Sequence, residues 1–245
     1  MSVRLSSCLL LFLSCISLPS VAQTTLTVAS AADLAPLQPD FLRLNPHLNF
    51  VTSASAVLSQ QIENGAPYDV FLSANAAYVD QLAQKRKIEP TSVVIYTVGR
   101  LGLLWRDGKS RKVNELSGSE VRSVILANPK LAPYGVAARQ ALEHAGIWDK
   151  VESKVVYAEN VRQALQLFES GNADAVLTSA SLLQGKPAQI IPDGWHAPIQ
   201  QKAGVVAGSP NEAAARAFLK LLTSPAGQAV FARHGFAPQA ASKAR

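Results

Sequence analysis

Short apolar runs alternate along the chain with segments whose apolar residues recur at helical spacing. Val57, Leu58 and Ile62, for example, form an apolar stripe on one face of a helix predicted at 55–63. Strands that alternate with helices of this length indicate parallel sheets and an α/β fold. The other predicted strands are 26–29, 48–52, 69–72, 92–98, 101–105, the end of 120–126, 154–158, 173–177 and 203–207, and the other helices are 34–42, 76–84, 134–145, 160–170, 211–222 and 226–234.

The alternation falls into two series that separate near Gly99-Arg100, and one more strand follows near the end of the chain. We therefore predict two lobes, each a mainly parallel sheet flanked by helices. Lobe 1 is expected to comprise 23–99 and 200–245, and lobe 2 to comprise 100–199. Ligands of open α/β sheets bind at the carboxyl ends of the strands, so the cleft between the lobes is the expected ligand site.

Small polar residues gather where strands end and helices begin. The first amides of a helix have no partner inside the helix, and together with the helix dipole they form an anion site. Turns favour small polar residues anyway, and Ser is an ordinary N-cap, so no single junction identifies a site. Several together predict a cleft ringed by helix N-termini. The junctions are Ser30–Asp33, Ser53–Ser55, Pro133-Tyr134, Asn160-Val161 and Thr178-Ser179.

The first 22 residues have the layout of a secretory signal peptide. Arg4 is their only charge, an apolar core follows from Cys8 to Leu18, and small residues precede a predicted cut after Ala22. This core is shorter than the ~20 residues that a spanning helix needs, so we expect no membrane insertion. The cut would leave a periplasmic chain without cysteine, because Cys8 and Cys15 are the only two. Such a chain has no disulfide, thiolate nucleophile or thiolate metal site.

Charge and motifs argue against several classes of function. Removing Arg4 lowers the formal net charge from +6 to +5, and the basic residues are scattered, which argues against nucleic-acid binding. A mildly positive field favours a small anionic ligand. The four histidines are isolated, and the chain has no phosphate-binding glycine loop and no nucleophile or zinc-protease motif. We expect a protein that is not an enzyme.

Several motifs in order along the chain resemble the periplasmic molybdate-binding proteins of ABC transporters. The segment 55–73, which contains Asn64-Gly65-Ala66-Pro67-Tyr68-Asp69, is similar to a signature of that family. The further similar segments are 96–101, 132–135, 158–165 and 224–236, so the resemblance covers nearly all of the chain after the signal peptide.

The resemblance implies a type II periplasmic-binding-protein fold that closes on a tetrahedral oxyanion. The ligand would be molybdate or tungstate, held by hydroxyls and backbone amides, with no separate cofactor. By match, the ligand-binding residues are Ala32, Asp33, Ser55, Tyr134 and Val161. Asp33, Ser55, Tyr134 and Val161 would be near a metal only in the sense that molybdenum or tungsten is the central atom of the bound oxyanion. The implied partners are the permease and ATPase of an ABC importer, and we expect a monomer.

Two positions depart from the family pattern. The first junction usually carries Ser, Thr or Asn, and here it reads Ala32-Asp33. A carboxylate ~4 Å from an anion costs about 4 kcal/mol at an effective dielectric constant near 20. We therefore predict that the Asp33 carboxylate turns away to cap its own helix and leaves its amide for the ligand. The second departure is Thr178, at a position where many members have Tyr; Tyr134 is then the candidate phenol.

The sequence is also compatible with other functions. The same architecture would suit sulfate, phosphate or a small organic acid, and arginine side chains in the pocket would favour the organic acid. An enzyme would show turnover of a small anionic substrate. An interaction module would have a closed, pocket-free surface between the lobes.

Overall fold

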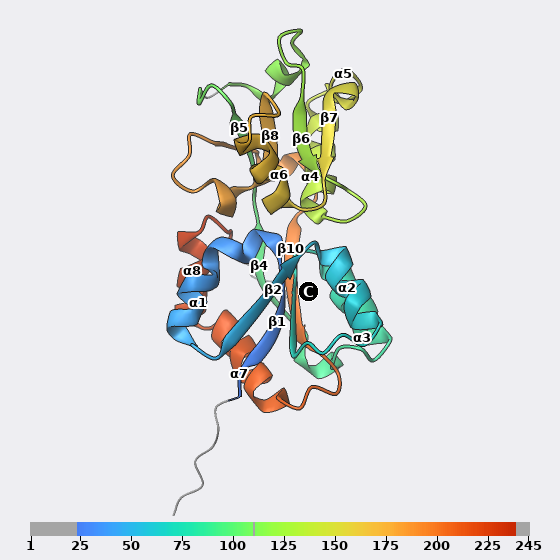
Figure 1. Cartoon of the computed structure of the whole chain (residues 1–245), viewed down its shortest axis with the longest axis vertical. Coiled ribbons are helices and arrows are strands. Elements are labelled where there is room, and N and C mark those ends of the chain that lie inside the picture. Colours follow the sequence, from blue (N-terminus) through green and yellow to red (C-terminus); the bar gives the residue numbers. More distant parts are fainter. Residues whose placement is uncertain (1–23, 110, 239–245) are drawn as a thin grey trace, which may run out of the picture.

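The computed structural model describes residues 24–109 and 111–238, and the predicted signal peptide lies outside the described residues. The chain forms two lobes, each built on a five-stranded sheet (Figure 1). In lobe 1 the strand order is β2 (Leu48–Ser53), β1 (Leu26–Ala31), β3 (Val70–Ser73), β10 (Ile199–Val205) and β4 (Val94–Gly99). In lobe 2 the order is β7 (Val155–Ala158), β6 (Val124–Ala127), β8 (Ala175–Ser179), β5 (Leu101–Trp105) and β9 (Gln189–Ile190).

The predicted two-lobed α/β fold is confirmed, and both sheets are mixed. Within each sheet three neighbouring strands run parallel, β2-β1-β3 in lobe 1 and β7-β6-β8 in lobe 2. The remaining strands are antiparallel to their neighbours. The chain passes from lobe 1 to lobe 2 at Arg100, between β4 and β5, and returns between β9 and β10. Strands β4 and β10 pair with each other, so the two crossings lie side by side.

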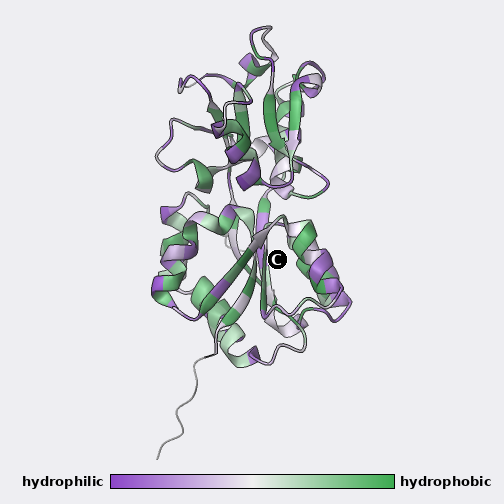
Figure 2. Ribbon diagram, viewed as in Figure 1, coloured by the Kyte–Doolittle hydropathy of each residue, from purple (hydrophilic) through white to green (hydrophobic). Residues whose placement is uncertain are grey.

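Helices cover both faces of each sheet. In lobe 1, α1 (Gln38–Leu44), α7 (Glu212–Thr223) and α8 (Pro225–Arg233) cover one face, and α2 (Ser55–Glu63) and α3 (Ala76–Gln84) cover the other (Figure 1). In lobe 2, α4 (Pro133–His144) and α5 (Trp148–Val151) lie opposite α6 (Val161–Glu169). Figure 2 shows the resulting pattern of apolar strands between helices whose outer faces are polar. The short 3-10 helices are η1 (Ala32–Leu37), η2 (Pro90–Ser92), η3 (Val113–Ser117), η4 (Glu152–Lys154), η5 (Ala180–Leu183) and η6 (Asp193–Trp195).

Two elements of the structure differ from their predictions in a way that matters for the site. The helix predicted at 34–42 is two helices, η1 and α1, because Pro36 and Pro39 lack the amide that a continuous helix requires. The strand predicted at 203–207 is β10, which begins earlier, at Ile199. The polar run Gln200-Gln201-Lys202 does not resemble a buried strand, so the start at Ile199 was not predicted, although Gln201 is completely buried. A bulge between Gln201 and Lys202 interrupts the pairing of β10 with β4.

Strand register brings the predicted junctions together. In lobe 1, Ala31 pairs with Ser53, so the chain leaves β1 and β2 at the same edge of the sheet. In lobe 2, Ala127 pairs with Ala158 in the same way. These two edges face each other, and residues 31–33, 53–55 and 73–75 of lobe 1 meet residues 131–134, 159–161 and 178–181 of lobe 2 (Figure 1). We call this contact the interlobe seam.

Candidate functional site

The interlobe seam is tightly closed. Ala31, Ala32 and Ala74 of lobe 1 belong to the same buried cluster as Tyr134 and Val161 of lobe 2. Hydrogen bonds also cross it: the Ala56 amide donates to the Leu131 carbonyl at 3.2 Å, and the Ser53 hydroxyl donates to Glu159 at 3.3 Å. The predicted site residues therefore lie along one contact between the lobes, although they are far apart in the sequence.

Three helices begin at this seam with a free amide. The amides of Ser55, Tyr134 and Val161 donate no hydrogen bond to any residue in the described part of the chain. They belong to the first turns of α2, α4 and α6, where the helix dipole is positive. All three residues are buried, so water does not readily replace the missing partner. Such amides are suited to an anion that enters the seam.

Ser55 offers its hydroxyl as well as its amide. It is not the N-cap of α2, which is Ala54; instead its Oγ accepts a hydrogen bond of 3.1 Å from the amide of Ala74. Because the oxygen is used as an acceptor from the protein, the hydroxyl hydrogen is available to donate. The residue that directly follows strand β3 thus orients Ser55 as a donor.

At the start of α6, side chains leave only the first amide free. The Asn160 side chain caps the helix and accepts hydrogen bonds of 3.0 Å from the amides of Arg162 and Gln163. The Thr178 hydroxyl donates to the carbonyl of Val161 at 2.9 Å. Thr178 thus holds this end of α6 in place, a role that its position in the sequence did not reveal.

The prediction that Asp33 caps its own helix is wrong. Helix η1 has no side-chain cap, and the Asp33 carboxylate lies in the seam with 1% of the residue exposed. Its Oδ2 accepts a hydrogen bond of 2.9 Å from the Tyr134 hydroxyl and another from the side-chain amide of Gln201. Its Oδ1 has no hydrogen-bond partner among the described residues. Two side-chain donors from elsewhere in the fold draw the carboxylate away from the cap position.

Burial dominates the electrostatics of this group. Loss of solvation raises the pKa of Asp33 to about 6, although the hydrogen bonds from Gln201 and Tyr134, and the nearby backbone amides of Asp33 and Leu34, act to lower it. Burial, together with the nearby Asp33 charge, also raises the pKa of Tyr134 and of Tyr96 well above the usual value. Both phenols are therefore neutral donors near neutral pH.

The bonds of Asp33 are part of a buried network that ties the seam to the lobe crossings. Tyr96 on β4 donates to Gln201 on β10 at 2.7 Å, and Ser181 of lobe 2 donates to the Asp33 carbonyl at 2.6 Å. Gly99 leaves room for the network, because a Cβ there would lie 2.1 Å from the Tyr134 hydroxyl oxygen. Sequence reasoning missed Gln201, Tyr96 and Ser181, since no local pattern distinguishes them.

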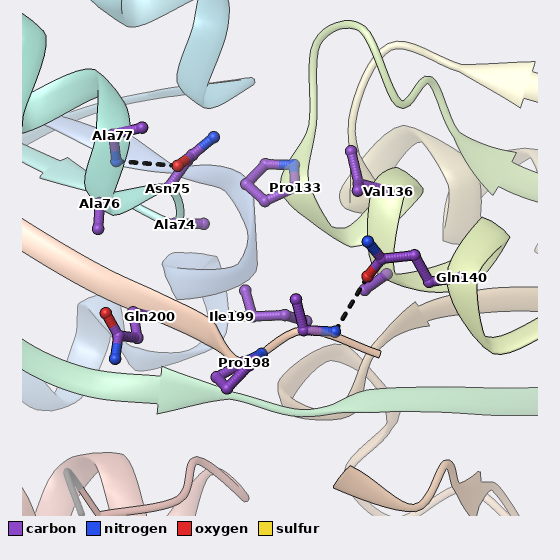
Figure 3. A pocket seen from close by; sticks show the side chains of 12 residues that line it. Ala74, Asn75, Ala76, Ala77, Pro133, Val136, Gln140, Pro198, Ile199 and Gln200 are labelled. Atoms are coloured by element: carbon purple, nitrogen blue, oxygen red, sulfur yellow. Dashed lines mark hydrogen bonds between the residues drawn. The ribbon is translucent and has the colours of Figure 1, made fainter. Parts of the chain in front are cut away.

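Two cavities open beside the seam. One, of about 340 Å³, is lined by Ala74, Asn75, Pro133, Val136, Gln140 and Pro198 among others (Figure 3). In it the Gln140 side chain accepts a hydrogen bond from the Ala197 amide, and Asn75 caps α3. The other, of about 370 Å³, is more polar and is lined by Ala32, Thr52, Asn160, Arg162, Gln163 and Gln166. Predicted site residues or their immediate neighbours thus line both.

The described residues contain no group of three or more His, Cys, Asp or Glu side chains that could hold a metal ion. None of the helices described is both long and apolar enough to cross a bilayer. The donors gathered at the seam are amides and hydroxyls, which suit an anion.

Comparison with known proteins gives consistent matches over most of the chain. The family model described as "Bacterial extracellular solute-binding protein" matches residues 26–237. The molybdate-binding protein ModA of Haemophilus influenzae is 31% identical, over 89% of this chain and 90% of that protein. The putative ABC transporter substrate-binding lipoprotein YvgL of Bacillus subtilis is 28% identical, over 90% of this chain and 89% of that protein.

Solved structures show the same architecture. The periplasmic molybdate-binding protein of Azotobacter vinelandii superposes with a TM-score of 0.81 at 28% identity, covering 87% of this chain and all of that one. The sulfate-binding protein SubI of Mycobacterium tuberculosis superposes with a TM-score of 0.68 at 19% identity, covering 88% of this chain and 87% of that one. The second similarity shows the shared fold alone.

Proposed function

This chain belongs to the family of bacterial extracellular solute-binding proteins, and from that premise we propose that it captures molybdate outside the cytoplasm and delivers it to an ABC importer. The observation that carries the proposal is the set of free, buried amides of Ser55, Tyr134 and Val161, which both lobes contribute to one seam. The relatives named molybdate-binding proteins support the choice of ligand.

The donors suffice in energy for tight binding. A hydrogen bond to a charged group contributes about 1.5–3 kcal/mol, and micromolar to nanomolar affinity needs about 8–12 kcal/mol. Three helix amides and the Ser55 hydroxyl, with the amides of Ala32 and Asp33 as further candidates, are enough donors for that range. Tungstate has the same charge and a similar shape, so we include it as a ligand.

The remaining parts of the proposal follow from the family. The partners are a membrane permease and its ATPase, and the protein acts as a monomeric carrier in the periplasm after the signal peptide is cut after Ala22. It binds its ligand without chemical conversion and has no enzymatic activity.

Isothermal titration of the ligand-stripped chain, residues 23–245, tests the proposal. We expect one-to-one binding of molybdate and tungstate, and much weaker heats with sulfate and phosphate. Binding of sulfate or phosphate alone would keep the site and change the ligand. Absence of heat with all four anions would refute oxyanion capture.

One observation supports a second candidate, a small organic anion. The polar cavity beside the seam includes Arg162, and arginine commonly binds carboxylates in a bidentate manner. Titration with a panel of organic acids, and with an Arg162→Gln variant, would test this. A loss of binding that is confined to organic acids in the variant would favour the second candidate.

A further inference from the structure

The Asp33 carboxylate lies in the seam without a positive partner. Its hydrogen-bond donors, the Tyr134 phenol and the Gln201 carboxamide, are both neutral. No ion pair within 4.0 Å in the described part of the chain includes Asp33. Such an uncompensated buried charge is costly, and the cost would grow if a second negative charge entered the same space.

The polar groups around Asp33 come from five elements outside its own. They are Tyr134 on α4, Gln201 on β10, Tyr96 on β4 behind Gln201, and Ser179 and Ser181 at the end of β8 and the start of η5. Of these only the two tyrosines titrate, and burial raises the pKa of each, so both stay neutral. Asp33 is therefore the group in this network that can change its charge near neutral pH.

Resting on the proposed function, we propose that capture of a doubly charged oxyanion is coupled to the uptake of one proton by Asp33. A ligand that accepts a hydrogen bond from the backbone amide of Asp33 would lie within about 8 Å of the carboxylate of the same residue. At that distance and an effective dielectric constant near 20, the two negative charges of the ligand would raise the pKa of Asp33 by more than one further unit. Burial has already brought this pKa to about 6, so the bound state would hold the proton at neutral pH.

The hydrogen bonds indicate which oxygen takes the proton. Oδ2 already accepts two hydrogen bonds, whereas Oδ1 has no partner among the described residues. A proton from the solvent would therefore form an O–H bond at Oδ1, and no other covalent bond would change. The bonds from Tyr134 and Gln201 to Oδ2 would remain, so the seam would keep its geometry while Asp33 became neutral.

Coupling of this kind has a defined signature. When binding takes up one proton, the affinity for the dianion rises by up to tenfold for each unit by which the pH falls. An Asp33→Asn variant imitates the protonated side chain, because its amide oxygen can accept from Tyr134 and Gln201 while its NH₂ replaces the protonated Oδ1. This variant should bind at pH 8 at least as tightly as the unchanged protein, and with little pH dependence. A merely structural role for Asp33 predicts weaker binding by the variant at every pH.

Titration calorimetry of residues 23–245 with sodium molybdate at pH 7, in buffers of different ionisation enthalpy, measures the proton directly. The slope of the observed enthalpy against buffer enthalpy should give an uptake of about one half to one proton for the unchanged protein, and near zero for Asp33→Asn. Glu159→Gln, which alters an exposed carboxylate at the same seam, is the matched control and should leave the uptake unchanged.

The outcomes separate this inference from the proposed function. Molybdate binding without proton uptake, or equal uptake by the Asp33→Asn variant, would overturn the coupling and leave the function standing. Absence of molybdate binding by the unchanged protein would overturn the proposed function, and the coupling with it.

Discussion

Two buried aspartates lie at opposite ends of the lobe 1 sheet, and their surroundings differ. Asp69, before β3, accepts from the Thr27 amide on one oxygen and from Ser209 and Asn211 on the other, at 2.6–3.2 Å. Asp33, after β1, accepts on one oxygen only. Both are nearly inaccessible, at 5% and 1% exposed. One end of the sheet is thus built as a fully bonded anchor, and the end at the seam retains unused bonding capacity, as a ligand site requires.

The largest expected effect comes from breaking the anchor. Asp69→Ala removes three hydrogen bonds to a buried charge and leaves their donors unpaired, so we expect a loss of about 4 kcal/mol in the free energy of unfolding. Urea denaturation followed by circular dichroism measures this. Asp69→Asn, which keeps one acceptor oxygen, should lose roughly half as much. Equal stability of the alanine variant would show that Asp69 is not an anchor.

The second effect concerns pH at the seam end. The pKa of Asp33 in the folded protein is about 6, above its ordinary value of 3.8, so the folded state binds the proton more tightly than the unfolded state. The contribution of Asp33 to stability is therefore fully present below about pH 4 and is lost as the pH rises through 6. The shift corresponds to a loss of about 3 kcal/mol at most.

The difference between the unchanged protein and Asp33→Asn isolates this effect from other titrations. We expect the variant to gain stability relative to the unchanged protein as the pH rises from 4 to 7.5, as measured by urea denaturation. A difference in the free energy of unfolding between the two proteins that stays constant over this pH range would contradict the raised pKa of Asp33.

The third effect concerns molybdate affinity at Ser55, the hydroxyl donor of the seam. Ser55→Ala removes the hydroxyl, and we expect molybdate affinity to fall by about ten- to a hundredfold, because one hydrogen bond to a charged ligand is lost. Calorimetric titration measures this. Ser59→Ala, on the next turn of α2, is the control and should bind normally. Unchanged affinity of the Ser55 variant would remove this residue from the site.

The smallest effect is expected at Thr178, which holds the first residue of α6. Thr178→Val keeps the volume and removes the bond to the Val161 carbonyl, so we expect a loss of about 1 kcal/mol in stability. Molybdate affinity should fall about threefold, because the Val161 amide is then held less firmly. If affinity and stability both stay unchanged, Thr178 does not position this amide.

Features that depend on neighbouring residues could be predicted from the amino-acid sequence. Apolar periodicity predicted α2 at 55–63 and α3 at 76–84 with the bounds that the structure shows, and the junction predicted at Asn160-Val161 is the start of α6. The alternation of strands and helices also led to the two-lobed fold. Capping and amphipathic spacing act within a few residues, so a single stretch of sequence contains the information they need.

The partners of the buried polar groups could not be predicted in this way, because they depend on contacts between distant segments. Asp33 bonds Gln201, which is 168 residues away, and Tyr134, which is 101 residues away. Ser55 is oriented by Ala74, which directly follows strand β3, and not by its own helix. A buried carboxylate takes the donors that the fold brings within hydrogen-bond distance, and those contacts exist only once two lobes and a strand crossing are in place. Local preference predicted a cap for Asp33, and long-range packing overrode it.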